Sequence, residues 1–536
     1  MNDSNIKVLV TCSGLGSRLG EITKNTNKSL VRIGNKAAIS YIIDSYPADT
    51  EFVITLGHFG SHVRQYLEIA HPKTKFEFIE VEKYTGPGSS LAHSLLCAKE
   101  VIGSNPFIFN ACDTLSIGKD DFDLSVNTVW ASSKKRDRSQ YRTVRTRGPK
   151  AMAVLDKGES VTDEPIYIGK CYIKDAGLFW SVLEKEVEDN KFDSSLSDCH
   201  GINGMLKLGS AFVSKNPEQW LDVGNLDELK KARSFFEFDA NVLEKYDESI
   251  YFVNDSVIKF FSNHNVNLQR VKRTEFLPNT TPKIQKYSKN FMSYKFTEGE
   301  IVCRLFGLTQ STLSSLLHFA HAEMWSKESN YSIEKCKKMC REFYIDKTKK
   351  RVENYLKARG MSDESSIING HYVENVDALL KRAVDLGILE GKMGHFHGDF
   401  ILENIISDSK NFTFIDWRQD FAGDIQFGDT YYDLAKLNHN LHFNHDIVRN
   451  NGYSVKFLGC NKTFVDIHCS HRILTMRRSL EEFCQSHGYS MSRVDILTGI
   501  IWINMSPLHD ANLGDFLYNF GKLYLQRAIE NEERIT

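Results

Sequence analysis

Short apolar segments alternate with amphipathic ones over the first 235 or so residues, and this alternation limits the fold more than any other feature. Four buried strands are expected at residues 7–11, 51–56, 76–81 and 106–110. Helical patterns lie between them at residues 37–45, 61–70 and 89–101. Strands that alternate with helices predict a mainly parallel sheet covered on both faces. We therefore expect an α/β fold, with a Rossmann-like doubly wound domain at the N-terminal end.

The pattern changes after about residue 235. Residues 249–261 read as a hairpin around the turn Asn254-Asp255. Residues 300–390 are largely helical in period, a compact motif segment occupies 395–435, and helices are expected from there to the end. This part of the chain is predicted to have an α+β fold.

The length of 536 residues is enough for two to four domains. Because the change of pattern falls at 236–245, we predict two domains, one over 1–238 and one over 239–536. No internal repeat or low-complexity tract is visible.

The charge balance argues against two classes of partner. Lys plus Arg number 67 and Asp plus Glu number 69, which gives a net charge of −2. A strongly basic nucleic-acid binder and a polybasic membrane patch are therefore not expected. The N-terminus lacks the pattern of a signal peptide, and no window approaches the roughly 20 apolar residues of a membrane span. With eleven scattered cysteines, these features favour a cytoplasmic protein.

A glycine-rich turn directly follows the first predicted strand and offers a place for phosphate. Gly14, Gly16 and Ser17 lie in this turn, where backbone N–H groups can approach phosphate oxygens closely. Arg18 offers forked donors to a triphosphate, and Lys28 supplies a mobile positive charge. The turn is neither a Walker sequence nor a complete dinucleotide fingerprint.

Further motifs follow this turn in a fixed order. They are the segment Lys28-Ser29-Leu30, a loop over 84–90 that contains Gly88 and Ser89, an apolar strand that ends at Asp113, and the segment 220–225 around Asp222. The set closely resembles the sugar-phosphate nucleotidyltransferase family, and its short form is similar to the capsule and phosphocholine cytidylyltransferase branch. The resemblance implies that Gly88 and Ser89 hold the nucleobase and that Asp113 and Asp222 hold Mg²⁺.

Some residues of this domain keep two interpretations. Lys170 either holds the phosphate of the acceptor or is a solvated surface lysine. Trp130, Tyr167 and Trp180 either form a cation-binding pocket or pack in the core, and core packing is favoured.

A second group of motifs lies far along the chain. His397-Gly398-Asp399 is followed by Asn404 and then by an apolar strand that ends at Asp416. Phosphoryl transfer to an alcohol needs a carboxylate that accepts the hydroxyl proton and further ligands for Mg²⁺. The catalytic and metal-binding loops of kinases space an Asp, an Asn and a second Asp in a similar way. Gly398 in place of Arg and Trp417 after Asp416 point away from the protein kinases.

The pattern is similar to the aminoglycoside phosphotransferase and choline kinase family, a two-lobed kinase-like fold. The resemblance implies that Asp399 is the catalytic base and that Asn404 and Asp416 hold Mg²⁺. It assigns the ATP-binding lysine and its helix partner to Lys259 and Glu275, places Glu298 in the hinge segment 294–299 that holds adenine, and gives Asp433 a structural role. No Gly-rich phosphate loop precedes Lys259.

Together the two groups of motifs predict a bifunctional enzyme. The C-terminal domain would phosphorylate a small alcohol or sugar with ATP. The N-terminal domain would then couple the phosphomonoester to an NMP group from CTP or UTP and release pyrophosphate. Similar enzymes make such products as precursors for the synthesis of cell-surface and capsule polysaccharides. The acceptor is open between an amino alcohol such as choline, used with CTP, and a sugar or amino sugar, used with UTP or another NTP. A single active nucleotidyltransferase with a regulatory kinase-like domain is the alternative.

Overall fold

The structure, a computed structural model, describes residues 6–118, 123–134, 136–160, 163–236, 247–304, 309–408 and 411–535, without the side chains of 472–474. It divides into two compact units. The first unit comprises Met1–Asn267 and Gln285–Phe296, and the second comprises Leu268–Ile284 and Thr297–Thr536. The predicted domain boundary between 238 and 239 lies outside the described residues.

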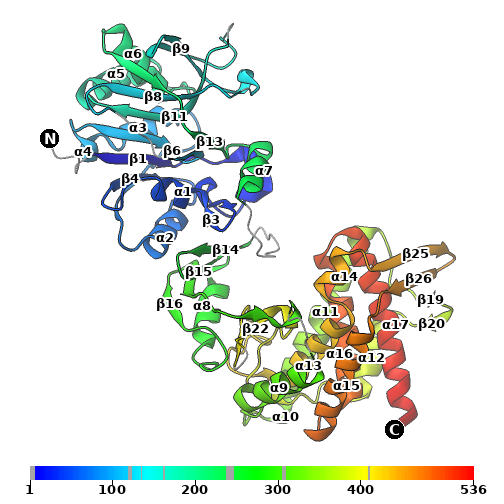
Figure 1. The fold of residues 1–536 in the computed structure, drawn as a ribbon. Helices are drawn as coiled ribbons and strands as arrows, with labels where there is room; N and C mark the ends of the chain where they lie inside the picture. Colours follow the sequence, from blue (N-terminus) through cyan, green and yellow to red (C-terminus); the bar gives the residue numbers. More distant parts are fainter. Residues whose placement is uncertain are drawn as a thin grey trace. The chain divides into compact units, whose positions relative to one another are not determined.

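A nine-stranded sheet forms the centre of the first unit (Figure 1). In spatial order its strands are β5 (Lys75–Glu80), β4 (Glu51–Leu56), β1 (Lys7–Cys12), β6 (Phe107–Ala111), β11 (Ile166–Ile173), β8 (Asn127–Ser132), β12 (Phe212–Lys215), β10 (Lys150–Leu155) and β9 (Thr143–Arg147). The first four are parallel, and they confirm the four predicted strands.

The rest of this sheet differs from the prediction of a mainly parallel sheet. Strand β11 runs antiparallel to both β6 and β8, and β10 runs antiparallel to β9 and β12. Only Gly148 and Pro149 separate β9 from β10, and such a short connection can join only antiparallel strands. The sheet is therefore mixed.

Helices cover both faces of this sheet. They are α1 (Ala38–Asp44), α2 (Gly60–Ala70), α3 (Leu91–Leu96), α4 (Lys99–Ile102), α5 (Ala176–Asp189), α6 (Asp198–Lys207) and α7 (Leu226–Phe235). The single helix predicted over 89–101 is instead the two short helices α3 and α4. Along β1, Val8 and Val10 pack in one core cluster and Leu9 in another. The strand is therefore buried on both faces, as expected where helices cover both sides of a sheet.

A small second sheet also packs within the first unit (Figure 1). Its strands in order are β14 (Glu248–Val253), β15 (Ser256–Phe261), β17 (Phe291–Lys295) and β16 (Ile284–Tyr287). The predicted hairpin around Asn254 is confirmed, and Asn254 has a φ of 52°. The Tyr251 hydroxyl donates to the Leu30 carbonyl at 2.8 Å, and the Tyr251 ring lies 4.9 Å from that of Tyr66 on α2. This sheet therefore shares a core with the helices of the large sheet.

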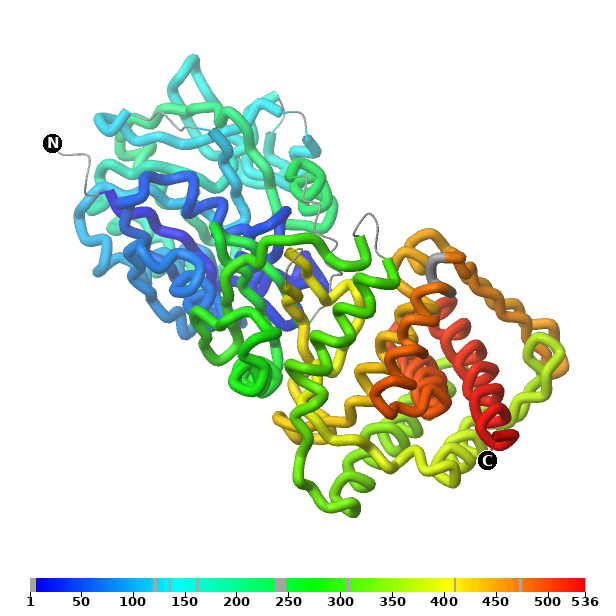
Figure 2. The backbone as a smooth tube through the Cα atoms, turned by 60° about the horizontal axis from the view of Figure 1, so that its bottom comes forward, coloured from blue at the N-terminus to red at the C-terminus, as the bar shows by residue number. Residues whose placement is uncertain are grey.

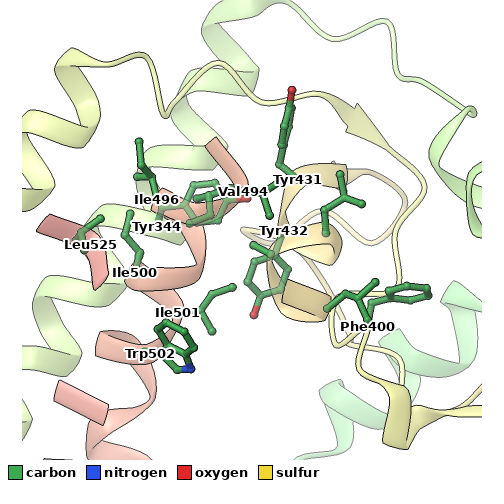
Figure 3. Close-up of a cluster of buried hydrophobic side chains, with 14 of the residues drawn as sticks. Tyr344, Phe400, Tyr431, Tyr432, Val494, Ile496, Ile500, Ile501, Trp502 and Leu525 are labelled. Carbon is green, nitrogen blue, oxygen red and sulfur yellow. The ribbon is translucent and has the colours of Figure 1, made fainter. Parts of the chain in front are cut away.

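The second unit is mainly helical. Its helices are α9 (Gln310–Ala320), α10 (Ile333–Cys340), α11 (Lys347–Arg359), α12 (Val376–Asp385), α13 (Thr430–His442), α14 (His445–Arg449), α15 (His471–Ser486), α16 (Met491–Met505) and α17 (Ala511–Ile535). Helices α16 and α17 lie side by side (Figure 2). Their apolar side chains, among them Trp502 and Leu525, join Tyr344 and Tyr432 in one core (Figure 3).

Short strands position the motif loops of this unit. The strands β18 (Glu300–Ile301), β22 (Ile405–Ser407) and β23 (Phe412–Phe414) form one sheet, and β21 (Met393–Gly394) pairs with β24 (Gly428–Asp429). The prediction that only helices follow residue 435 is wrong, because β25 (Tyr453–Gly459) and β26 (Lys462–Ile467) form a hairpin. This hairpin pairs with β19 (Ser366–Ile368), which pairs with β20 (His371–Val373). Within the described ranges, we find no helix with both the length and the apolar character that a membrane span requires.

Two candidate active sites

In the first unit, the glycine-rich turn is fixed to the segment that carries Lys28. Strand β1 ends at Cys12, and Gly16 has a φ of 69°, a conformation that favours glycine. The Asn27 amide nitrogen donates to the Cys12 carbonyl at 2.8 Å and to the His58 carbonyl at 2.6 Å. Its oxygen accepts from the Ser29 N–H at 2.9 Å. Asn27 thus holds the turn and the Lys28 segment together. Its position next to Lys28 is the only sequence signal for this role, and it does not predict the hydrogen bonds.

The end of β6 brings Asp113 to this turn. The Lys28 ammonium forms a partly buried ion pair with the Asp113 carboxylate. Burial alone would raise the pKa of Asp113, but the Lys28 and Arg18 charges hold that pKa below its ordinary value. The pKa of Lys28 is raised in turn, because the attraction of Asp113 outweighs its desolvation.

Asp222 reaches the same place from β13 (Gln219–Asp222), which pairs with β7 (Thr114–Ile117). A methyl group added to Gly224 would lie 2.9 Å from Asp222 Oδ1, 3.0 Å from Asp113 Oδ2 and 3.5 Å from Arg18 Nη2. The two predicted carboxylates and the predicted arginine therefore surround one point. Only glycine leaves this space open.

Tyr141 is a neighbour of Asp222 that sequence reasoning missed. Its hydroxyl donates to Asp222 Oδ2 at 2.7 Å, and the Gly224 N–H donates to Oδ1 at 2.7 Å. Despite these two donors, burial and the nearby Asp113 charge raise the pKa of Asp222. Two close carboxylates in a buried place are a donor set that suits a hard divalent cation, so the residues present fit Mg²⁺.

The loop predicted to hold the nucleobase leads into helix α3. Gly88 has a φ of 83°, and the Ser89 hydroxyl donates to the Gly86 carbonyl at 2.7 Å. Ser90 begins the helix by accepting the His93 N–H at 3.1 Å. The Ser94 hydroxyl of the same helix is 2.7 Å from that of Ser13, which ties the helix to the glycine-rich turn.

The structure decides part of the open interpretations of Lys170 and the aromatic residues. Lys170 is only 1% exposed, so it is not a solvated lysine. Its Nζ lies 4.9 Å from the ring centre of Tyr46 and 5.1 Å from that of Trp130. Tyr167 and Trp180 are buried in the core of the first unit, which agrees with the favoured interpretation.

In the second unit, the motif loop brings Asp399 and Asn404 together. The Asn404 amide nitrogen donates to Asp399 Oδ2 at 3.1 Å and to the Asp399 carbonyl at 3.0 Å. On its other side Asp399 Oδ1 lies 2.9 Å from the Lys436 ammonium, which α13 supplies. Lys436 was not predicted, although it lies in the segment that follows the metal-binding motif. Lys436 and Asn404 together hold the Asp399 carboxylate in place.

Asp416 follows β23, as the motif requires. The Ile415 N–H donates to the Asn404 carbonyl at 2.9 Å, so the two loops run beside each other. Asp416 has a φ of 60°, an uncommon conformation for this residue type that typically marks a functional or tightly held position. Its Oδ1 lies 3.6 Å from Arg270 Nη1. Asp416 and Asn404 thus offer oxygen ligands of the kind that Mg²⁺ takes.

Buried groups support this loop from behind. Asp433 is fully buried and accepts hydrogen bonds from the backbone N–H groups of His397 at 2.6 Å and Gly398 at 2.7 Å. It also accepts one from the Trp325 indole at 3.0 Å. The structural role expected for Asp433 is confirmed. Gly398 has a φ of 87°, and a Cβ there would lie 2.5 Å from the Cβ of Arg418, which explains why no larger residue stands at this position.

Arg273, which sequence reasoning missed, connects several loops of the second unit. The fully buried guanidinium donates to the backbone carbonyls of Phe396, His397, Arg418 and Ile425. It therefore joins the segment that carries Asp399 to the segment that follows Asp416. Burial lowers the pKa of Arg273 to about 9, so the group stays charged near neutral pH.

The three residues predicted to bind ATP lie on three different segments. Lys259 is on β15 and is buried. Helix α8 (His264–Arg273) ends before Glu275, which is exposed in the turn after it rather than on the predicted helix. The helix is short because backbone turns at 274–277 lead into Pro278. Glu298 is exposed in the loop after β17. The roles of these three residues stay predictions.

Comparison with known proteins finds relatives of the N-terminal part. The bifunctional protein GlmU of Methanococcus maripaludis is 22% identical over 229 residues, which are 42% of this chain and 54% of that protein. A UTP–glucose-1-phosphate uridylyltransferase of Klebsiella pneumoniae is 26% identical over 265 residues, 40% of this chain and 88% of that protein. A probable glucose-1-phosphate cytidylyltransferase of Bacillus subtilis is 28% identical over 134 residues, 21% of this chain and 51% of that protein. The chain thus spans about half the length of the first and the third.

Solved structures give matches of the same extent. A UDP-glucose pyrophosphorylase in complex with UDP-glucose is 17% identical with a TM-score of 0.38, covering 43% of this chain and 98% of that one. CTP:phosphocholine cytidylyltransferase from Streptococcus pneumoniae is 17% identical with a TM-score of 0.36, covering 43% and 99%. No known family model matches the chain. By its sequence relatives, which match 40–42% of the chain, the N-terminal part is similar to the sugar-phosphate nucleotidyltransferases.

Proposed function

We propose that this chain is a bifunctional transferase that carries out two consecutive reactions. The N-terminal site would transfer an NMP group from CTP or UTP to a phosphomonoester and release pyrophosphate. The C-terminal site would make that phosphomonoester from a small alcohol or sugar and ATP. The observation that carries the first half is the convergence of Asp113, Asp222 and Arg18 around Gly224, with Lys28 paired to Asp113.

The nucleotidyl transfer needs positive charge around the triphosphate. An oxygen of the acceptor phosphate attacks the α-phosphorus of the NTP, and the bond to pyrophosphate breaks. Arg18 and Lys28 would neutralise the charge that develops on the phosphate oxygens. Mg²⁺ held by Asp113 and Asp222 would supply further charge neutralisation when bound. The backbone of Gly14, Gly16 and Ser17 would bind the triphosphate, and Gly88 and Ser89 the nucleobase.

The proposed phosphoryl transfer centres on Asp399. Its carboxylate would accept the proton of the alcohol while the alcohol oxygen attacks the γ-phosphorus of ATP and ADP leaves. Asn404 and Lys436 fix the carboxylate by direct contacts. Asn404 and Asp416 would hold Mg²⁺, which would neutralise the transferring phosphate. Lys259, Glu275 and Glu298 are proposed to bind ATP.

Joining both reactions in one chain has a simple chemical reason. The product of a kinase that acts on an alcohol is a phosphomonoester, the acceptor that a nucleotidyltransferase requires. A shared chain keeps the two activities in fixed ratio and raises the local concentration of the intermediate. The final product would be an activated precursor for a cell-surface polysaccharide.

The test is a product analysis by mass spectrometry. The full chain is incubated with Mg²⁺, ATP, a pooled set of alcohols, amino alcohols and sugars, and either CTP or UTP. We expect one compound to appear first as its monophosphate and then as its nucleotide conjugate. If supplied monophosphates are conjugated but no alcohol is phosphorylated in the presence of ATP, the kinase half of the proposal is wrong.

A further inference from the structure

Several basic side chains of the second unit form a group that reaches Asp399 through Lys436. Lys436 on α13 contacts Asp399 directly, at 2.9 Å. Lys347, the first residue of α11, places its Nζ 4.2 Å from the ring centre of Phe343. The Arg418 guanidinium lies 5.0 Å from the centre of the same ring. Lys347, Arg418, Lys436 and the nearby Arg351 are called the basic cluster below.

Carboxylates balance the positive charge of the basic cluster only in part. Asp399 is engaged by Lys436, whereas no ion pair with Lys347 or Arg418 is present in the described part of the second unit. Arg418 donates to the backbone carbonyl of Asp420 at 3.0 Å, and Arg351 to the Asn504 carbonyl at 3.3 Å. The remaining acidic group that acts on Lys347 is the carboxylate of Asp420.

This surplus of charge is costly in the free protein. Burial lowers the pKa of Lys347 to about 6, and the charges of Arg418, Arg351 and Lys436 act in the same direction, against Asp420. Like charges that repel one another beside a candidate catalytic carboxylate are typical of a site that a negatively charged ligand completes.

We propose that the alcohol phosphorylated at Asp399 is an anion, a hydroxy compound that carries a carboxylate or phosphate group, and that Lys347 and Arg418 bind this group. The inference rests on the proposed phosphotransferase function. The forked donors of Arg418 match either anionic group, and Lys347 adds a point charge. The hydroxyl oxygen attacks the γ-phosphorus, its proton passes to Asp399, and ADP leaves. A cationic amino alcohol such as choline would be repelled by the same cluster.

The first experiment uses matched acceptors with the full chain and MgATP. The sets are glycerol, glycerate and glycerol 3-phosphate, then glucose and gluconate, and finally choline. We expect kcat/KM to be at least about tenfold higher for an anionic member than for its neutral partner. Preference for glycerate and gluconate identifies a carboxylate, and preference for glycerol 3-phosphate a phosphate. Faster phosphorylation of glycerol, glucose or choline would overturn the inference while leaving the proposed phosphotransferase function intact.

Two variants separate the acceptor from the triphosphate of ATP. Lys347→Met should raise the KM of the anionic acceptor about tenfold to a hundredfold and leave the KM of ATP unchanged. If the KM of ATP rises instead, the cluster binds the nucleotide and the inference is wrong. Lys349→Met is the matched control, because Lys349 lies on the same helix and forms an exposed ion pair with Asp377. It should behave like the wild type.

A measurement of anion binding tests the inference even if no acceptor of the panel is phosphorylated. Calorimetry with Mg²⁺ and a non-hydrolysable ATP analogue would measure binding of glycerate, glycerol 3-phosphate and inorganic phosphate in two buffers of different ionisation heat. Because an anion stabilises the charged form of Lys347, binding at pH 7 should take up protons, and Lys347→Met should lose this uptake. No binding of any of the three tighter than about 10 mM would overturn the inference. An Asp399→Asn variant with unchanged ATP turnover would instead count against the phosphotransferase function.

Discussion

The two candidate sites differ in how far their charged side chains are paired. In the first unit Lys28 pairs with Asp113 and Tyr141 donates to Asp222, so each carboxylate has a partner before any ligand binds. In the second unit Lys436 pairs with Asp399, but Lys347 and Arg418 add positive charge without a paired carboxylate. The first arrangement is ready for a metal ion and a triphosphate, each of which brings its own charge. The second lacks negative charge that a ligand would supply.

Substitution in the carboxylate pair of the first unit should have the largest effect on activity. Asp222→Asn should reduce nucleotidyl transfer by about a thousandfold or more, because a carboxylate that would hold the charge-neutralising Mg²⁺ is lost. Phosphoryl transfer from ATP should stay at the wild-type rate. Asp227→Asn, in the exposed first turn of α7, is the control. A rate of nucleotidyl transfer close to wild type in Asp222→Asn would contradict the proposed role of this carboxylate.

The next effect concerns the buried guanidinium of the second unit. Arg273→Met should lower the free energy of unfolding by about 3 kcal/mol, because four buried carbonyls lose a charged donor. It should also reduce phosphoryl transfer, since the loop of Asp399 loses its link to the segment after Asp416. Urea unfolding and ATP turnover measure the two losses. Lys272→Met on the same helix is exposed and should change neither.

A smaller effect is expected from the hydroxyl that supports Asp222. Tyr141→Phe keeps the ring against Trp220 but removes the hydrogen bond of 2.7 Å. Nucleotidyl transfer should fall about tenfold, the usual cost of one hydrogen bond to a charged group. The Mg²⁺ concentration needed for half of the maximal rate should rise. An unchanged Mg²⁺ dependence would show that Tyr141 does not position this carboxylate.

The smallest expected effect tests the shared core of the first unit. His62 on α2 lies 5.0 Å from Phe260 of the small sheet, and burial lowers the pKa of His62 to about 4. The unfolded chain therefore binds more protons between pH 4 and about 6.5, so stability should fall as the pH is lowered through this range. His62→Leu should remove roughly 2 kcal/mol of the stability change between pH 7 and pH 5. An unchanged acid slope in thermal unfolding would mean that His62 is not buried against this sheet.

The sequence predicts the parts of the fold that local patterns specify. The four parallel strands and the Asn254 hairpin follow from apolar runs and turn residues, and both are confirmed. The direction of β11 could not be predicted, because strand pairing depends on contacts between distant segments. The hairpin over 453–467 was missed although its residues alternate between polar and apolar, since a run of helices was expected there.

The same limit applies to the sites. Asp113, Asp222 and Arg18 were predicted from motifs, and the structure brings them to one place. Tyr141, Lys436 and Arg273 carry no motif, because their roles arise only when separate segments fold against each other. Lys347 stands out because burial and the charges of Arg418 and Lys436 lower its pKa, and these neighbours are known only from the fold.

In the proposed function, two separate carboxylates, Asp399 and Asp113, serve two consecutive reactions on one chain. The most direct measurement compares Asp399→Asn and Asp113→Asn with the wild type, using ATP, CTP or UTP and the acceptor found by product analysis. We expect Asp399→Asn to make no phosphomonoester yet to conjugate a supplied one at the wild-type rate, and Asp113→Asn to accumulate the phosphomonoester. The proposed function would be contradicted if Asp399→Asn still phosphorylated the acceptor at the wild-type rate, or if either substitution abolished both reactions in a folded protein.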